Sequence, residues 1–97
     1  MSAEANQQFL MGMKNIQDEI IKQVRATGAQ VSAESFRWNM GQKLVPPPEA
    51  VTVEVKLLGR TFNAVFPREF VDDSCGRIER HEVTSMVDLI VSDLTKP

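Results

Sequence analysis

The sequence predicts a small α+β domain: an antiparallel β-hairpin, or a sheet of three strands, packed against a long N-terminal helix and a C-terminal helix. Three patterns predict this class. Apolar residues recur every three or four positions near both ends of the chain, which is typical of amphipathic helices. Between positions 51 and 66 apolar and polar residues alternate, which is typical of strands with one buried face.

The first pattern is a stripe with spacings of four, three, four and four residues: Phe9, Met13, Ile16, Ile20 and Val24. It predicts a helix over about residues 4–25, roughly 33 Å long, closed by Gly28 as a left-handed terminal residue. The helix is long for so small a domain, and its stripe has heptad-like spacing. We therefore predict that these five residues bind a partner, either a second copy of the chain or another protein. The alternative is that they pack inside the domain.

Residues 33–40 fit two structures. Ser32 is a suitable cap for a short helix from Ala33 to Met40 that Gly41 would end. The same segment also alternates as a strand from Phe36 to Met40. The short helix is the preferred prediction.

A run of three prolines follows at positions 46–48. Proline donates no backbone hydrogen bond and favours extended polyproline geometry, so residues 42–49 should form an extended connector. We predict a single domain over residues 1–97. It has a helical front half at 1–45, a proline-rich connector at 46–49, and a hairpin with the C-terminal helix at 50–97.

The hairpin register follows from parity. If Leu58 and Gly59 form a two-residue loop, Val55 faces Phe62 and Val53 faces Ala64. Both apolar rows then lie on one side of the hairpin, whereas a slip by one residue would expose one whole row. Because leucine is a poor residue for positive φ, a type I turn with a bulge at Gly59 is an equal alternative.

Pro67 should end the second strand and start a short helix that Gly76 closes. The last helix carries the stripe Val83, Met86, Val87, Ile90, Val91 and Leu94. Two strands alone are marginally stable. This favours a third strand from residues 36–45, or extension of the sheet across a dimer interface.

The composition excludes several classes of function. With 42% hydrophobic residues and a net charge of −2, the chain gives no global electrostatic reason to bind nucleic acid or an anionic membrane. The N-terminus lacks the features of a secretory signal, and no apolar run approaches about 20 residues. With Cys75 as the single cysteine, no internal disulfide is expected. We therefore expect a cytoplasmic protein.

The sequence offers few residues for chemistry. Cys75, His81 and Asp72 or Asp73 are the residue types of a nucleophile, base and orienting carboxylate. Two neighbouring carboxylates disfavour a thiolate, however. One histidine and one cysteine do not make a metal site, and scattered single glycines do not make a phosphate loop. We predict no catalytic residue, metal, cofactor or small-molecule substrate.

A nucleic-acid interface is an alternative. Lys56, Arg60 and Arg68 are the nearest approach to a basic patch. The order of helix, strands and final helix resembles that of double-stranded-RNA-binding domains. Those domains open their last helix with a lysine-rich segment, whereas here the segment is GRIERHEV, so nucleic-acid binding is the less favoured prediction.

The leading prediction is a non-enzymatic interaction or adaptor protein that dimerises or binds a protein partner through its first helix. The general profile, small, acidic and poor in cysteine, resembles that of bacterial adaptor and secretion-chaperone proteins, although no motif carries the resemblance. A nucleic-acid-binding module is the second prediction. An enzyme that depends on the Cys75 thiol is the third.

Overall fold

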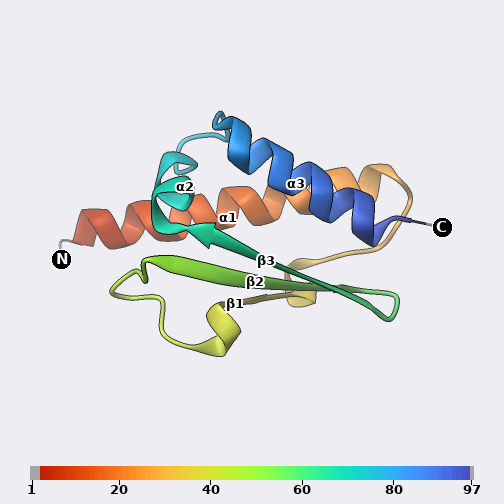
Figure 1. The fold of residues 1–97 in the computed structure, drawn as a ribbon, viewed down its shortest axis with the longest axis horizontal. Coiled ribbons are helices and arrows are strands. Elements are labelled where there is room, and N and C mark those ends of the chain that lie inside the picture. The colour runs from red at the N-terminus through yellow and green to blue at the C-terminus, as the bar shows by residue number, and fades with distance from the viewer. Residues whose placement is uncertain (1–2, 97) are drawn as a thin grey trace.

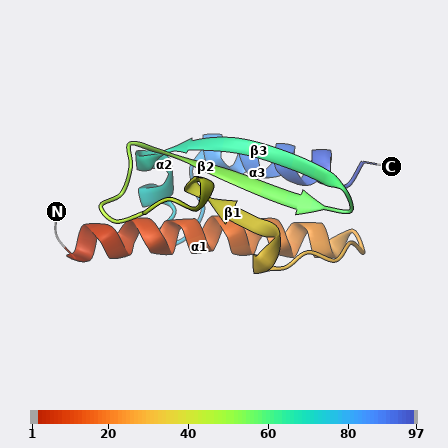
Figure 2. The ribbon, with the colours of Figure 1, turned by 90° about the horizontal axis from the view of Figure 1, so that it is seen from below.

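The chain folds into two layers, a three-stranded antiparallel sheet and a layer of helices on one of its faces (Figure 1). The structure, a computed structural model, describes residues 3–96. Its elements are α1 (Ala3–Ala26), β1 (Phe36–Trp38), β2 (Ala50–Leu57), β3 (Arg60–Pro67), α2 (Arg68–Asp73) and α3 (His81–Leu94). Figure 2 shows α1 beside β1 and α3 behind β3. The predicted α+β class is confirmed.

The hairpin has the predicted register. Val55 lies opposite Phe62 and Val53 opposite Ala64. Leu58 and Gly59 have φ values of 50° and 80°, so the loop has the two positive φ angles of a type I′ turn, and the alternative with a bulge is wrong. The strand order is β1-β2-β3, which makes β1 and β3 the two edges of the sheet.

The preferred helix over residues 33–40 is wrong, and the competing strand is present. Ala33–Ser35 forms one 3-10 turn, and Phe36–Trp38 then pairs with residues 53–55 of β2. This pairing turns the rings of Phe36 and Trp38 to the core side, and the Trp38 ring centroid lies 6.5 Å from that of Phe66. Partial burial of the two rings against the core, together with the pairing to β2, outweighs the local preference for a helix, so the front half of the chain is not all helical.

The other predicted elements hold with small shifts. Helix α1 contains the predicted range, and Gly28 after it has a φ of 93°. Residues 42–49 contain no helix or strand, as predicted. Helix α2 starts directly after Pro67 but ends at Asp73, three residues before Gly76. At this end the Ser74 hydroxyl donates to the Phe70 carbonyl, which satisfies one of the last free acceptors of the helix.

The core lies between the sheet and the helices. It joins the stripe of α1 to the inward row of the hairpin and to one face of α3. Its fully buried large side chains are Phe9, Phe66, Ile16, Ile20, Ile90, Val24, Val51, Val53, Val55, Val71, Val83 and Val87. None of the helices described within residues 3–96 is long and apolar enough to cross a bilayer.

Helix α2 is held against α1 by polar contacts around a glycine. A Cβ atom on Gly12 would lie 1.8 Å from the Val71 carbonyl oxygen, so only glycine permits this approach. On either side of it, the Gln8 amide donates to the Asp72 carbonyl and the Asn15 amide to the carbonyls that follow α2. These donors satisfy the free carbonyls at the C-terminal end of α2.

Candidate functional site

The five residues predicted to bind a partner are core residues of the domain. Phe9, Ile16, Ile20 and Val24 have no exposed surface, and Met13 has 7%. They face the sheet and the other helices, so a partner that docks on the intact domain meets other residues. The exposed large apolar residues of α1 are Leu10 and Met11.

The three basic residues of the nucleic-acid alternative do not form one patch. Arg60 is the first residue of β3 and Arg68 directly follows the strand, so the two lie about 26 Å apart along it. Each guanidinium donates to a carbonyl, of Asp93 and Pro47 respectively. The Lys56 ammonium lies 3.7 Å from the Glu54 carboxylate. The outward residues of the three strands include no aromatic ring on which a base could stack.

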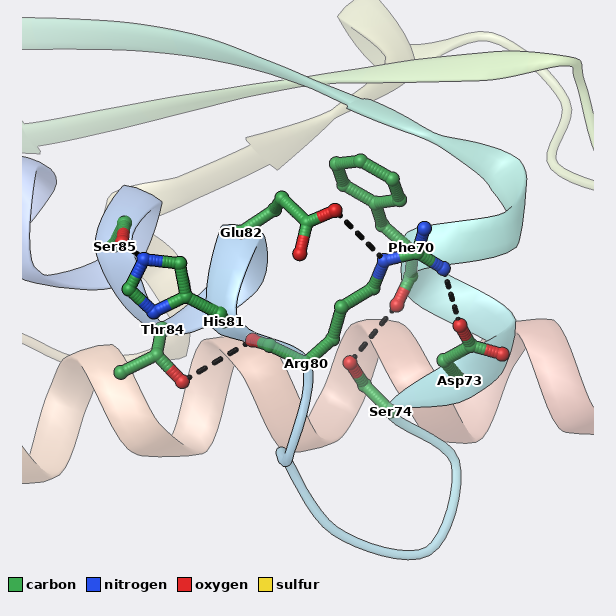
Figure 3. A network of polar contacts seen from close by, with 8 residues as sticks. All are labelled: Phe70, Asp73, Ser74, Arg80, His81, Glu82, Thr84 and Ser85. Carbon is green, nitrogen blue, oxygen red and sulfur yellow. Dashed lines mark hydrogen bonds and ion pairs between the residues drawn. The ribbon is translucent and has the colours of Figure 1, made fainter.

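His81 and Asp73, the base and carboxylate of the thiol alternative, each contact a residue other than Cys75. His81 Nε2 lies 3.4 Å from Ser85 Oγ, one helical turn along α3. The Asp73 carboxylate accepts a hydrogen bond from Arg80. Figure 3 shows the His81 ring directed to Ser85 and away from Asp73. No group of three or more possible metal-ligating side chains occurs within residues 3–96.

Arg80 is the centre of a polar network that the sequence did not reveal (Figure 3). Its guanidinium carbon lies 4.2 Å from the centroid of the Phe70 ring, and its nitrogens bond to Asp73 and Glu82. The hydrogen bond to Asp73 raises the pKa of Arg80. The Glu82 pKa is lowered, first by its own backbone N–H and then by Arg80. The network joins the end of α2 to the start of α3, and no spacing motif marks it in the sequence.

Asp72 on α2 is a partly desolvated carboxylate. Burial raises its pKa, against the opposing effect of Arg68, and nearby Asp73 raises it further. Its Oδ1 atom is buried and has no hydrogen-bond partner among the described residues. Its ionised form is therefore destabilised by the fold.

The outer edge of β3 has more backbone N–H and C=O groups without a strand partner than the outer edge of β1. The Arg68 N–H donates to the Glu49 carbonyl at 2.8 Å, at the end of the β2–β3 ladder. Antiparallel ladders bond at every second pair, so the even-numbered residues of β3 bond to β2. The N–H and C=O groups of Thr61, Asn63 and Val65 therefore point away from β2. No backbone hydrogen bond to these groups is found within residues 3–96.

The flank of α3 that carries Met86 and Leu89 lies beside this edge. The opposite flank faces α1, because Thr84 and Val87 line a hollow of about 240 Å³ together with Glu19 and Gln23. Arg60 of β3 reaches the Asp93 carbonyl on α3. On a helical wheel the residues on the Asp93 side are Glu82, Met86 and Leu89. Leu89 is 54% exposed and Met86 is half-buried.

The edge position of β3 could not be read from the sequence. Alternation reveals which side of a strand is apolar, but it does not reveal whether another strand follows on its free side.

No family model, curated protein or solved structure matches the chain.

Proposed function

We propose that the protein is a non-enzymatic interaction protein, of the adaptor kind, which takes up an extended segment of a protein partner at the outer edge of β3. The observation that carries this proposal is the row of outward backbone groups at Thr61, Asn63 and Val65. An unpaired strand edge is a template for an added strand, whose main-chain bonds supply affinity.

The side chains of β3 support the same proposal. Between Arg60 and Arg68 the strand reads TFNAVFP and has no charged residue. Natural sheets usually protect an edge with lysine, proline, an inward charge or a very short strand. In β3 the charge of Arg60 and the ring of Pro67 lie only at the two ends of the strand, and residues 61–66 between them carry none of these devices. Val65 on the open face is 55% exposed, which adds apolar surface next to the edge.

The polar side chains near α2 and α3 fit a non-enzymatic interaction protein better than they fit an enzyme. Arg80 bonds to Asp73 and to Glu82, and His81 lies against Ser85. The contact between Arg80 and Asp73 links α2 to the start of α3, and the other two lie within the start of α3, so we infer a structural role for them.

A peptide titration observed by NMR tests the proposal. The probe is a soluble peptide of alternating threonine and valine with a lysine at each end, added at up to millimolar concentration. We expect amide shifts and slower hydrogen exchange at Thr61, Asn63 and Val65, with the amides of β1 unchanged. Equal or larger changes at β1, or no change at either edge of a protein that is monomeric at the concentration used, would refute docking at β3.

A further inference from the structure

We infer that the strand received at this edge is β3 of a second copy of the chain, so that two domains share one six-stranded sheet about a two-fold axis. The inference rests on the proposed function, because it names the partner of the same edge. Its basis is that β3 is complementary to itself in one register.

Two geometric conditions select that register. The outward bonding groups belong to odd-numbered residues. Each of Thr61, Asn63 and Val65 must therefore lie opposite one of these same three residues in the second copy. The apolar faces of both copies must also lie on the same side of the joined sheet, because a slip by one residue exposes a row. Both conditions hold when Asn63 meets Asn63 of the second copy and Thr61 meets Val65 of the second copy. All three residues then exchange both of their hydrogen bonds.

Neighbouring registers are worse. A shift by two residues in one direction would bring Thr61 opposite Pro67 of the second copy, and proline has no N–H to donate. It would also bring Arg60 opposite Arg68 of the second copy, and like charges in direct opposition are destabilising. A shift in the other direction would leave Val65 opposite Gly59 in the turn. The chosen register opposes no like charges.

The helix layer adds contact area to the same interface. Helix α3 lies behind β3 (Figure 2), with Met86 and Leu89 on the flank directed away from α1. Joining the two β3 edges brings these flanks toward each other across the two-fold axis. Leu89 would then be covered by the second copy.

Sedimentation equilibrium between about 5 and 200 μM provides the first test. We expect a monomer–dimer equilibrium in this range. Asn63→Lys places two ammonium groups next to each other on the axis and should weaken dimerisation at least tenfold. The matched control is Thr52→Lys on β2, which lies on the same open face but away from the interface and should leave the dissociation constant within about twofold. Equal effects of the two substitutions would overturn the inference.

Cysteine cross-linking tests the register itself. In a Cys75→Ser background, Asn63→Cys should give a disulfide-linked dimer under mild oxidation, since bonded pairs have Cα atoms about 5.5 Å apart. Val65→Cys is the control, because in this register its counterpart lies about 13 Å away along the strand. Efficient linking through position 65, or none through position 63, would overturn the register.

Failure of this inference can be separated from failure of the proposed function. A monomer at 200 μM that still binds the threonine–valine peptide at β3 would reject the second copy as partner and keep the docking edge. A protein that is monomeric at 200 μM and does not bind the peptide would refute both the dimer and the docking edge. If the protein dimerises but no disulfide forms through Asn63→Cys, the dimer interface lies on another surface.

Discussion

The two edges of the sheet differ in length, in their ends and in charge. Strand β1 has three residues, lies between two 3-10 turns, and is followed by Asn39 and Met40 with positive φ. Its outward bonding groups belong only to Phe36 and Trp38, because Arg37 lies opposite Glu54, whose backbone groups face β1. Strand β3 has eight residues and presents three outward bonding residues in an uncharged run.

The difference shows how a small sheet can protect one edge and leave the other available. At β1 the turns stop the strand before a partner could form a ladder, and the Trp38 indole N–H donates to the Gln17 side chain of α1. At β3 no comparable device interrupts the strand before Pro67. Edges of the second kind are the ones at which chains associate.

Both edges depend on the common core, so the largest effect is expected from Ile16→Asp. Ile16 is fully buried, and an unpaired carboxylate there should cost about 4 kcal/mol or more. Against a total stability of about 5–10 kcal/mol, urea denaturation followed by circular dichroism should show a largely destabilised domain. The control is Met11→Asp on the exposed side of α1, expected to change stability by less than about 1 kcal/mol. A stable Ile16→Asp domain would mean that the stripe of α1 is not core.

Trp38→Ala tests the protected edge. Loss of the ring contact with Phe66 and of the hydrogen bond to Gln17 should lower the free energy of unfolding by about 2–3 kcal/mol. The dimer dissociation constant should stay unchanged under conditions where the variant is folded, because association uses the other edge. Trp38→Phe, which keeps an aromatic ring, should lose less stability. Dimer loss in a folded Trp38→Ala variant would reverse the roles of the two edges.

Gly12→Ala tests the support of the segment that follows β3. The added Cβ would overlap the Val71 carbonyl, so α2 must move away from α1, at an expected cost of about 1–3 kcal/mol. The gain in helix propensity, about 1 kcal/mol, offsets part of this cost. The control is Gly76→Ala, where a Cβ meets no atom within 4 Å. Thermal unfolding should separate the two variants, and equal melting temperatures would contradict the close α1–α2 contact.

The smallest effect is expected from Asp72→Asn, which also lies beyond the end of β3. Because burial raises the pKa of Asp72 in the folded state, ionisation of this carboxyl opposes folding as the pH rises through the folded-state pKa. The asparagine variant should therefore melt at a higher temperature near pH 7. The advantage should vanish below the ordinary aspartate pKa of 3.8, where both side chains are neutral. A constant difference from pH 3 to pH 7 would show that the cause is not ionisation.

Much of the fold follows from local periodicity. The spacing from Phe9 to Val24 predicted α1, and the alternation from Val51 to Phe66 predicted the register of the hairpin. The candidate site was not predictable in the same way. The residues proposed from the sequence as partner-binding are core residues, and the basic residues proposed for nucleic acid do not form one patch.

The reason is physical. Periodicity determines which side of each segment is apolar, because side chains repeat every 3.6 residues in a helix and every two in a strand. It does not determine what covers that side. Only the tertiary structure decided that the sheet and α3 cover the stripe of α1, and that Phe36 and Trp38 form a third strand instead of a helix. The same packing placed β3 at the edge of the sheet, where Thr61, Asn63 and Val65 keep backbone groups without a strand partner.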